Sequence, residues 1–426
     1  MTQVVQLQPP TNLDWALPLP GSKSITNRAL LFASIARGTS TLRGWLDADD
    51  TRHMRACLSA LGVAVEERDG ALVVPGSGGR LSTDEAPELF VGTAGTVARF
   101  LLPALAGSNV GATMDGTPRM RERPMAMLID GLRSMGAELH CLGEEGFLPL
   151  RIHPTDGLHG GEVRLSRPAS SQFVSGLAVA ATLAAGPVDI VLEQGTPARP
   201  YVDMTLRVLE AFGGRGSWNG NTLHIEPCSL EAQTYTIEPD ASAASYPLTL
   251  AAIHGGKATA QLGSASLQGD ARFPEVLEVL GARVSQTETR TTVEGTGTLR
   301  GGAFDLTDMP DMTLTLAVAA LFAEAPTEIR GVEILRHHES DRLAVAATEL
   351  RKLGAEVDEH PDGLTIRPPG AGVRSGVEID TYDDHRVAMA FAMAGHVGIR
   401  DPECVGKTYP DYFNHLQQTG MVVART

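Results

Sequence analysis

Residues 127–136 read MLIDGLRSMG, an apolar-periodic run that closes on the string Leu-x-x-x-Gly. A glycine directly after a helix adopts the left-handed conformation at little cost, so this string predicts where a helix ends. The same ending closes six such runs, at Gly62, Gly136, Gly213, Gly281, Gly354 and Gly420. Successive closing glycines lie between 66 and 77 residues apart, which indicates six copies of one unit of about seventy residues.

An alternating segment, a turn and a second alternating segment follow each of the first five glycines. Residues 355–358 and 363–367 are one example, and this pattern predicts a β-hairpin. Each unit also contains a second run that is apolar on nearly every face, which predicts a helix buried in a core. These buried helices are expected to begin near Ser22, Thr93, Ser170, Asp240, Asp308 and Asp383. The predicted fold class is therefore α/β.

The length of the chain, 426 residues, exceeds what one hydrophobic core ordinarily holds, so two domains are expected. Six units divide evenly into three and three. Connections rich in Gly, Pro or polar residues, which are typical of domain boundaries, lie at 18–21 and near 238–240. The predicted domains are therefore residues 21–239 and residues 240–426.

Composition excludes several classes of partner. The net charge of −16 argues against nucleic acid or an anionic membrane surface as the main partner. No apolar stretch approaches the roughly 20 residues that a bilayer span needs, and the first residues do not resemble a signal peptide. Four separated cysteines and twelve histidines form no metal-ligand motif, so no metal is expected and the cysteines are interpreted as reduced thiols. Together these observations predict a cytoplasmic protein.

Several predicted helix starts combine a backbone anion site with a cationic side chain. The N-terminus of a helix offers unpaired N–H groups and a partial positive charge. Alone, each such segment is more often structural than functional, but five of them stand at equivalent places in the repeat. If the units are pseudo-symmetric, these cations converge on a shared cleft that fits a ligand with more than one anionic group. The five segments are 20–28 (PGSKSITNR), 118–124 (PRMRERP), 339–342 (ESDR), 383–386 (DDHR) and 406–408 (GKT).

These segments also carry a resemblance to a known family. The matching strings are, in order, 20–29 (PGSKSITNRA), 94–96 (AGT), 118–124 (PRMRERP), 170–172 (SSQ), 339–343 (ESDRL), 384–386 (DHR) and 407–412 (KTYPDY). The chain resembles the enolpyruvyl transferases, specifically the 5-enolpyruvylshikimate-3-phosphate (EPSP) synthases, over about nine-tenths of its length. The resemblance implies two similar domains, each of three βαβαββ-type units. It also implies that segment 1–20 joins the second domain and that the active site lies in the cleft between the domains.

The reaction that this resemblance implies moves the enolpyruvyl group of phosphoenolpyruvate to the 5-hydroxyl of shikimate 3-phosphate and releases phosphate. It proceeds by addition and elimination through a tetrahedral intermediate, in the shikimate pathway towards chorismate and the aromatic amino acids. The family needs neither a metal nor an organic cofactor, and we expect a monomer. The chain is also an expected glyphosate target, because Gly95 matches the position whose small size admits this inhibitor in sensitive relatives.

The resemblance implies roles for single residues. Those implied to bind phosphoenolpyruvate are Lys23, Gly95, Arg123, Gln172, Arg342, Arg386 and Lys407. Those implied to bind shikimate 3-phosphate are Lys23, Ser24, Arg28, Ser170, Ser171, Gln172, Tyr201 and Asp311. For proton transfer, the resemblance implies Asp311 at the substrate hydroxyl and Glu339, with Lys23 sharing the role, at C3 of phosphoenolpyruvate. His385 is either a base or an anion contact.

Five positions depart from the family pattern and receive no role: Thr93, Phe100, Ala198, Ile334 and His338. They bear mainly on how the phosphate of shikimate 3-phosphate is bound. An enolpyruvyl transferase with another acceptor and a homologue that binds anions without catalysis are therefore alternative interpretations. A UDP-N-acetylglucosamine enolpyruvyl transferase is disfavoured, because Ser24 follows Lys23 where that branch has Asn, and because no loop cysteine stands in the catalytic region.

Overall fold

All six Leu-x-x-x-Gly endings close an α-helix in the computed structural model, which describes residues 3–83 and 85–425. The glycine after each helix has a φ between +78° and +107°, in the left-handed region that favours glycine. The six predicted helix ends are therefore confirmed. The helices are α2 (Asp49–Ala60), α5 (Ala126–Ser134), α7 (Arg199–Ala211), α9 (Phe273–Val279), α11 (Arg342–Lys352) and α13 (Tyr412–Gln418).

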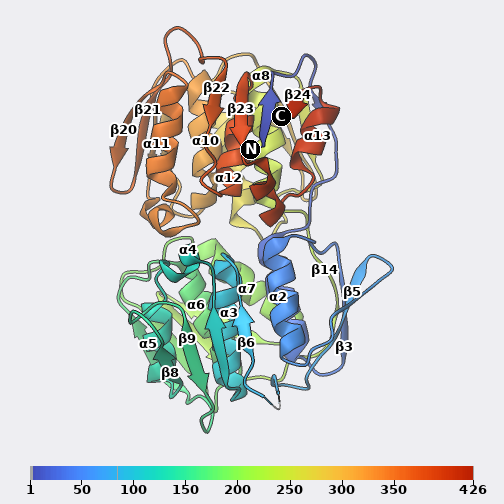
Figure 1. Ribbon diagram of the computed structural model, residues 1–426, viewed down its shortest axis with the longest axis vertical. Helices are drawn as coiled ribbons and strands as arrows, with labels where there is room; N and C mark the ends of the chain where they lie inside the picture. The colour runs from blue at the N-terminus through green and yellow to red at the C-terminus, as the bar shows by residue number, and fades with distance from the viewer. Residues whose placement is uncertain (1–2, 84, 426) are drawn as a thin grey trace. The chain divides into compact units, whose positions relative to one another are not determined.

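The chain forms two compact units, whose elements are labelled in Figure 1. One unit comprises Gly21–Glu238 and is called the N-terminal unit below. The other comprises Met1–Pro20 together with Pro239–Thr426 and is called the C-terminal unit. Among the described residues, each unit contains three four-stranded sheets.

The second helix of each repeat is buried, as its sequence predicts. These helices are α1 (Lys23–Ile35), α3 (Gly95–Ser108), α6 (Ser171–Thr182), α8 (Ala241–His254), α10 (Thr313–Ala319) and α12 (His385–Ala392). Five of the six begin within two residues of the predicted start. The exception is α10, which begins five residues after Asp308 because Pro310–Met312 first form a separate 3₁₀ turn, η2.

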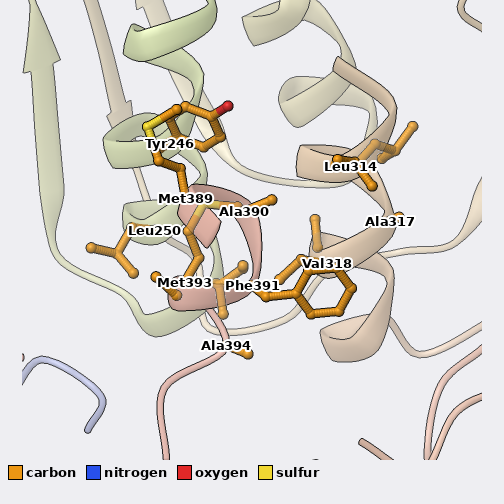
Figure 2. Close-up of a cluster of buried hydrophobic side chains, with 14 of the residues drawn as sticks. Tyr246, Leu250, Leu314, Ala317, Val318, Met389, Ala390, Phe391, Met393 and Ala394 are labelled. Carbon is orange, nitrogen blue, oxygen red and sulfur yellow. The ribbon is translucent and has the colours of Figure 1, made fainter. Parts of the chain in front are cut away.

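Apolar side chains of three of these helices pack together in the C-terminal unit (Figure 2). Tyr246 and Leu250 of α8 pack with Met389 and Phe391 of α12 in one cluster, and Val318 of α10 adjoins them. All five side chains are at most 1% exposed. Burial of this kind is the main stabilising contribution to folding, at about 25 cal/mol per Å² of apolar surface.

Every sheet follows one topology. Along each sheet, the first two neighbouring strands are parallel and the next two are added antiparallel. In five sheets these last two strands form a hairpin, whereas in the sixth they are the first and last strands of the chain. In the second repeat the chain order, apart from the one-turn helix α4 before α5, is β6–α3–β7–α5–β8–β9, a βαβαββ unit. The five predicted hairpins, β4–β5, β8–β9, β12–β13, β16–β17 and β20–β21, are all present.

In spatial order, the sheets of the N-terminal unit are as follows. They are β14 (Thr234–Thr236), β3 (Thr39–Arg43), β5 (Ala71–Pro75) and β4 (Glu66–Arg68); β6 (Glu88–Phe90), β7 (Ala112–Asp115), β9 (Leu150–His153) and β8 (Glu138–Cys141); and β10 (Gly161–Leu165), β11 (Val188–Leu192), β13 (Thr222–Glu226) and β12 (Arg215–Asn219). Those of the C-terminal unit are β2 (Asp14–Trp15), β15 (Lys257–Ala260), β17 (Thr291–Glu294) and β16 (Arg283–Gln286); β18 (Gly302–Asp305), β19 (Thr327–Arg330), β21 (Gly363–Arg367) and β20 (Glu356–His360); and β22 (Val377–Ile379), β23 (Val397–Arg400), β1 (Val4–Leu7) and β24 (Val422–Arg425).

Three sheets are completed by strands from distant parts of the sequence. The first strand of the chain, β1, lies between β23 and β24, with Val5 opposite both Ile399 and Arg425. The short strand β2 forms the parallel edge of the fourth sheet beside β15, and β14 does the same for the first sheet beside β3. The pairings of β1 and β2 explain why the segment before α1 belongs to the C-terminal unit.

The remaining helical segments are short: α4 (Pro118–Arg121), η1 (Gly269–Arg272), η3 (Ala320–Phe322), η4 (Glu333–His337) and η5 (Pro402–Lys407). None of the helices within the described ranges has the length and apolar character that crossing a membrane requires.

Candidate functional site

The start of α1 positions Lys23 in the N-terminal unit. Ser22 caps the helix, since its hydroxyl oxygen accepts from the Ile25 N–H. The Lys23 ammonium lies 2.9 Å from a carboxylate oxygen of Asp50, and the two side chains are only 13% and 8% exposed. Asp50 stands in the first turn of α2, where the sequence analysis assigned no site residue. A partly buried opposite charge fixes an ammonium strongly, so Asp50 holds the Lys23 side chain in place.

Arg28 is buried against neutral groups. Its Nε donates to Thr205 Oγ1 at 2.7 Å, and its terminal nitrogens donate to the carbonyl oxygens of Ser24 and Tyr201 at 2.9 and 3.0 Å. The guanidinium carbon lies 4.6 Å from the centroid of the Phe100 ring. Burial lowers the pKa of Arg28 to about 9, because the charged form has lost water without gaining an anionic partner.

Gly95 opens α3 directly beneath the Arg123 guanidinium. A Cβ at position 95 would lie 2.8, 2.9 and 3.0 Å from Nη2, Nη1 and Cζ of Arg123. Arg123 is 5% exposed, and its guanidinium donates to the Thr93 carbonyl oxygen at 2.9 Å. Thr93 in turn places its hydroxyl 2.9 Å from that of Thr117. The present position of Arg123 therefore requires that residue 95 has no side chain.

The start of α6 carries the Ser-Ser-Gln string. Ser170 caps the helix by accepting from the Gln172 N–H at 3.2 Å, and Ser171, its first residue, is buried. The Gln172 side-chain oxygen accepts from Arg99 Nη1 at 3.0 Å. Arg99 also donates to the Pro124 carbonyl oxygen at 3.2 Å. The amide of Gln172 is thus oriented by a buried arginine that is not among the predicted site residues.

Arg99 is a second buried cation. Its guanidinium carbon lies 5.0 Å from the centroid of the Phe173 ring, and its side chain is almost fully buried. Burial, with a smaller contribution from the nearby charge of Arg123, lowers the pKa of Arg99 well below its usual value. Within residues 3–83 and 85–425, neither Arg28 nor Arg99 forms an ion pair with a carboxylate. The N-terminal unit therefore holds two buried positive charges that lack a counter-ion.

Asp311 joins two arginines in the C-terminal unit. Its Oδ1 accepts from Arg342 Nη1 at 2.9 Å and its Oδ2 accepts from Arg386 Nη2 at 2.7 Å. The arginine side chains are 4% and 9% exposed, and that of Asp311 is 17% exposed. His338 Nδ1 lies 3.0 Å from Arg342 Nη1 and 3.8 Å from Asp311 Oδ1. Three predicted site residues, 31 and 75 positions apart in sequence, are thus in direct contact.

Asp384 orders the start of α12. It is fully buried and accepts from Nε and Nη2 of Arg342 at 2.8 and 3.1 Å, from the Ser340 hydroxyl at 3.0 Å, and from the Arg386 N–H at 3.0 Å. Burial opposes its charged form, but the Arg342 charge outweighs burial and lowers the pKa of Asp384. In the sequence, Asp384 is marked only by its place in the Asp-His-Arg string. Its partner Arg342 lies 42 positions away, so no local pattern indicates their contact.

Glu339 stands between a histidine and a lysine. Its Oε2 lies 2.8 Å from His385 Nδ1 and 3.7 Å from Lys407 Nζ. Lys407 Nζ is also 2.9 Å from Asp383 Oδ2. Burial would lower the pKa of Lys407, but the charges of Glu339 and Asp383 outweigh it and raise that pKa. The side chains of His385, Glu339 and Lys407 are 1%, 10% and 12% exposed, whereas that of Asp383 is 76% exposed and faces water.

One set of donors in this unit could hold a cation. One ligand atom each of Glu339, Asp384 and His385 lies within 4.8 Å of the others. Asp384 is, however, already bound by Arg342, so a cation there would compete with a buried guanidinium. These contacts fit a site for anions better than one for a metal, and the expected absence of a metal stays a prediction.

The five departures from the family pattern occupy defined places. Ala198 precedes α7 with a φ of +52° and is 2% exposed, and Ile334 is buried in η4. Phe100 stacks on Arg28, Thr93 holds Arg123 through its carbonyl oxygen, and His338 contacts Arg342. At these places Ala198 and Ile334 offer no polar side-chain atom.

Comparisons with known proteins agree over almost the whole chain. The family model for EPSP synthase (3-phosphoshikimate 1-carboxyvinyltransferase) matches residues 7–416. The chain is 42% identical to a 3-phosphoshikimate 1-carboxyvinyltransferase of Tolumonas auensis, over 96% of this chain and 97% of that one. It is 43% identical to the chloroplastic enzyme of the same name from Petunia hybrida, over 97% of this chain and 84% of that one.

Solved structures give the same picture. The fold is similar to that of an EPSP synthase from Acinetobacter baumannii, with a TM-score of 0.82, 26% identity and full coverage of both chains. It is equally similar to the enolpyruvyl transferase NikO of Streptomyces tendae, with a TM-score of 0.81, although only 18% of the residues are identical, so this likeness concerns the fold alone. The family model and the 42–43% identity over nearly the full length show that the chain belongs to the EPSP synthase family.

Proposed function

We propose that this chain transfers the enolpyruvyl group of phosphoenolpyruvate to the 5-hydroxyl of shikimate 3-phosphate and releases phosphate. The observation that carries this proposal is the pair of buried arginines, Arg28 and Arg99, whose charges meet only neutral groups and a neighbouring cation. A buried charge without a counter-ion is costly, and an anionic ligand would offset that cost. The family membership names the two anionic substrates that fit.

In the N-terminal unit, the proposal assigns the buried and capped side chains to substrate binding. Arg28, Ser24, Ser170, Ser171 and Tyr201 hold shikimate 3-phosphate. Charge-assisted hydrogen bonds to phosphate and carboxylate oxygens are about twice as strong as neutral ones, which favours cations and hydroxyls in these roles.

Phosphoenolpyruvate is assigned to cations of both units. Lys23, Gln172 and Arg123 with Gly95 contribute from the N-terminal unit, and Arg342, Arg386 and Lys407 contribute from the C-terminal unit. Both sets therefore serve one reaction in this proposal. One phosphate and one carboxylate carry enough charge to engage several cations, and the planar guanidinium group suits bidentate contacts.

Two carboxylates are assigned to proton transfer. Asp311 accepts the proton of the 5-hydroxyl while that oxygen adds to C2 of phosphoenolpyruvate. Glu339, with Lys23 sharing the role, supplies a proton to C3. The tetrahedral intermediate then loses phosphate as the C3 proton returns to the enzyme. Positioned acid–base groups of this kind contribute about 10²–10⁴-fold to rate.

The experiment is phosphate release by the purified protein, with each substrate omitted in turn and a chelator present. We expect release only when both substrates are present, and Asp311→Asn should lower kcat about 10²–10⁴-fold with a smaller change in KM. Asp308→Asn is the matched control, because Asp308 lies three positions away with a half-exposed side chain and only a long ion pair to Arg272. Normal turnover by the Asp311 variant would refute its assignment as the base.

We further propose that the chain is a cytoplasmic monomer and that its reaction requires no metal or cofactor. Its four cysteines are free thiols, which fits a reducing compartment. Light scattering coupled to size exclusion tests the monomer, and full activity in the presence of chelator tests the absence of a required metal.

A further inference from the structure

The hairpin β8–β9 of the N-terminal unit carries two histidines and a glutamate on its solvent-facing side. Glu138 and His140 lie on β8 and His153 lies on β9. One ligand atom of each, a carboxylate oxygen or a ring nitrogen, lies within 4.8 Å of the other two. The residues assigned to the two substrates come from other positions, so this cluster is independent of the proposed reaction.

The strand register produces this cluster. Glu138 stands directly opposite His153 in the antiparallel pair, and His140 follows two positions after Glu138, on the same face. A residue and its diagonal neighbour across such a pair remain within reach of long side chains, and the two imidazole centroids are 5.0 Å apart. Leu139 and Ile152 point to the opposite, buried face.

Two of the three side chains are exposed and that of His153 is half-buried. The side chains of His140 and Glu138 are 61% and 53% exposed, and their closest approach is 3.9 Å, from Nε2 to Oε1. Within the described ranges, the three side chains make no other hydrogen bond or ion pair. One positive group stands nearby: Arg151 is opposite His140, but its Nε is directed to Thr113 Oγ1 of β7 at 3.5 Å.

We propose that Glu138, His140 and His153 bind a divalent first-row transition metal ion, with Zn²⁺ as the representative ion. Two imidazoles and one carboxylate, with water in the remaining position, form a known zinc ligand set. Donors bonded to tetrahedral zinc at about 2.0–2.1 Å lie about 3.4 Å apart, so the present cluster needs to contract by less than about 1.5 Å. Rotation of the exposed side chains supplies that contraction without moving the strands.

The third repeat provides a natural comparison. On the equivalent hairpin β12–β13, His224 lies between Asp189 and Glu226, with its ring nitrogens 2.7 and 3.1 Å from their carboxylate oxygens. Hydrogen bonds to Glu226 and then Asp189 raise the pKa of this histidine, so both nitrogens are engaged in ion pairs. One histidine with two carboxylates makes an ion-paired surface, whereas two histidines with one carboxylate make a metal site.

The test is equilibrium titration of tag-free protein with Zn²⁺ in competition with a chromogenic chelator. We expect one site in the unaltered protein, and its affinity should fall at least about tenfold in the double variant His140→Ala/His153→Ala. His224→Ala is the matched control and should bind Zn²⁺ as the unaltered protein does. Saturating Zn²⁺ should also raise the melting temperature of the protein, but not that of the double variant.

Two results would overturn the proposal. One is unaltered zinc affinity in the double variant, which would place the metal elsewhere, with Glu339, Asp384 and His385 as the next group to test. The other is no detectable binding by the unaltered protein at millimolar Zn²⁺. Metal-free turnover should be the same in all three proteins, because none of the altered residues has a catalytic or substrate-binding role, and equal turnover also shows that the variants are folded.

Discussion

At the scale of single residues, the two units hold their buried cations in opposite ways. In the N-terminal unit, Arg28 and Arg99 donate to neutral oxygens and face aromatic rings. In the C-terminal unit, Arg342 and Arg386 are bound by Asp311, and Arg342 also by Asp384. In the proposed site, a substrate anion would meet cations without counter-ions in one unit and would compete with a carboxylate in the other. Competition of this kind favours ligands that bring more than one negative group.

Gly95→Ala tests the contact between α3 and Arg123. The added Cβ would lie within 3.0 Å of three guanidinium atoms, so Arg123 must shift. We expect the KM for phosphoenolpyruvate to rise about tenfold or more, because a cation displaced by even 1 Å loses much of its effect. Steady-state rates at varied phosphoenolpyruvate measure this, and glyphosate inhibition measured alongside shows whether the same space admits the inhibitor.

The control for this variant is Gly107→Ala, which lies in the same helix but whose Cβ would meet the Leu183 side chain instead. It should change stability rather than KM. An unchanged KM for phosphoenolpyruvate in Gly95→Ala would mean that Arg123 does not hold this substrate.

Asp384→Asn tests the buried pairing with Arg342. Removing one partner of a buried ion pair leaves an uncompensated charge, so we expect a loss of about 3–5 kcal/mol in unfolding free energy at neutral pH. The pKa of Asp384 is lower in the folded than in the unfolded chain, where it is near 3.8. Its contribution is therefore fully present above about pH 4 and is lost as the pH falls below that value.

Urea unfolding at several pH values measures both effects of Asp384→Asn. The variant should lose less stability than the unaltered protein between pH 5 and pH 3. Parallel curves would show that another carboxylate determines the acid sensitivity. Asp358→Asn, on exposed β20, is the matched control.

At the scale of elements, the sequence predicted most of the local structure. Three features depend on residues only a few positions apart: the helix ends at Leu-x-x-x-Gly, the hairpins and the buried helices. The sequence pattern of a single repeat is therefore enough to predict them. What the pattern lacked was pairing over distance. The strand β14 pairs with β3 across 193 positions of sequence, and Asp384 pairs with Arg342 across 42 positions. No local sequence pattern indicates either partner. The resemblance, and not the pattern, implied the place of residues 1–20.

The closing glycine Gly213 is predicted to matter through its backbone conformation alone. At Gly213, φ is +91° and a Cβ would meet no atom within 4 Å. Gly213→Ala should therefore cost about 1–2 kcal/mol in unfolding free energy, the price of a left-handed conformation for an ordinary residue. Gly213→Asn should cost less, because asparagine tolerates this conformation better. Equal losses in the two variants by urea unfolding would contradict this account.

The loop before α12 holds two adjacent residues, Tyr382 and Asp383, with φ of +55° and +54°. Such residues cost about 1–3 kcal/mol each and persist only where contacts determine them. The Tyr382 hydroxyl donates to Glu349 Oε1 at 2.8 Å, and Glu349, fully buried in α11, is paired with Lys352. This bond ties the loop that carries Asp384 and Arg386 to the helix that begins at Arg342.

Tyr382→Phe should loosen that loop. A hydrogen bond to a charged group contributes about 1.5–3 kcal/mol, so we expect kcat/KM to fall about tenfold and the melting temperature to fall by a few degrees. Burial and Glu349 raise the pKa of Tyr382 to about 12, so the phenol keeps its proton and the effect should not depend on pH between 6 and 9. Glu359→Gln, at an exposed ion pair with Arg336, is the control and should leave kcat/KM unchanged.

At the scale of the whole molecule, the two units differ in how their sheets are completed. The N-terminal unit draws all its strands from Gly21–Glu238. The C-terminal unit needs β1 inside one sheet and β2 at the edge of another. We therefore expect residues 21–238 to fold alone and residues 239–426 not to do so. Joining residues 1–20 after residue 426 through a flexible linker should restore folding.

Near-ultraviolet circular dichroism and urea unfolding show whether each of three chains folds: residues 21–238, residues 239–426, and residues 239–426 joined to residues 1–20. A cooperative transition in 239–426 alone would mean that β1 and β2 add little to the C-terminal unit. The variant Val5→Asp in the full chain is a milder test, because Val5 is 2% exposed and its strand pairs on both sides.

The place of β1 also sets an order of events at the ribosome. The strand β1 is translated before the rest of its sheet, whereas its neighbours β23 and β24 are translated last. More than four hundred further residues must therefore be made before β1 can pair on both sides. At about 5–20 residues per second, this wait lasts about 20 to 85 seconds. Throughout that time the nascent chain presents an apolar strand without partners, while Gly21–Glu238 can already be complete. Newborn molecules should therefore bind chaperones through their leading segment until synthesis ends.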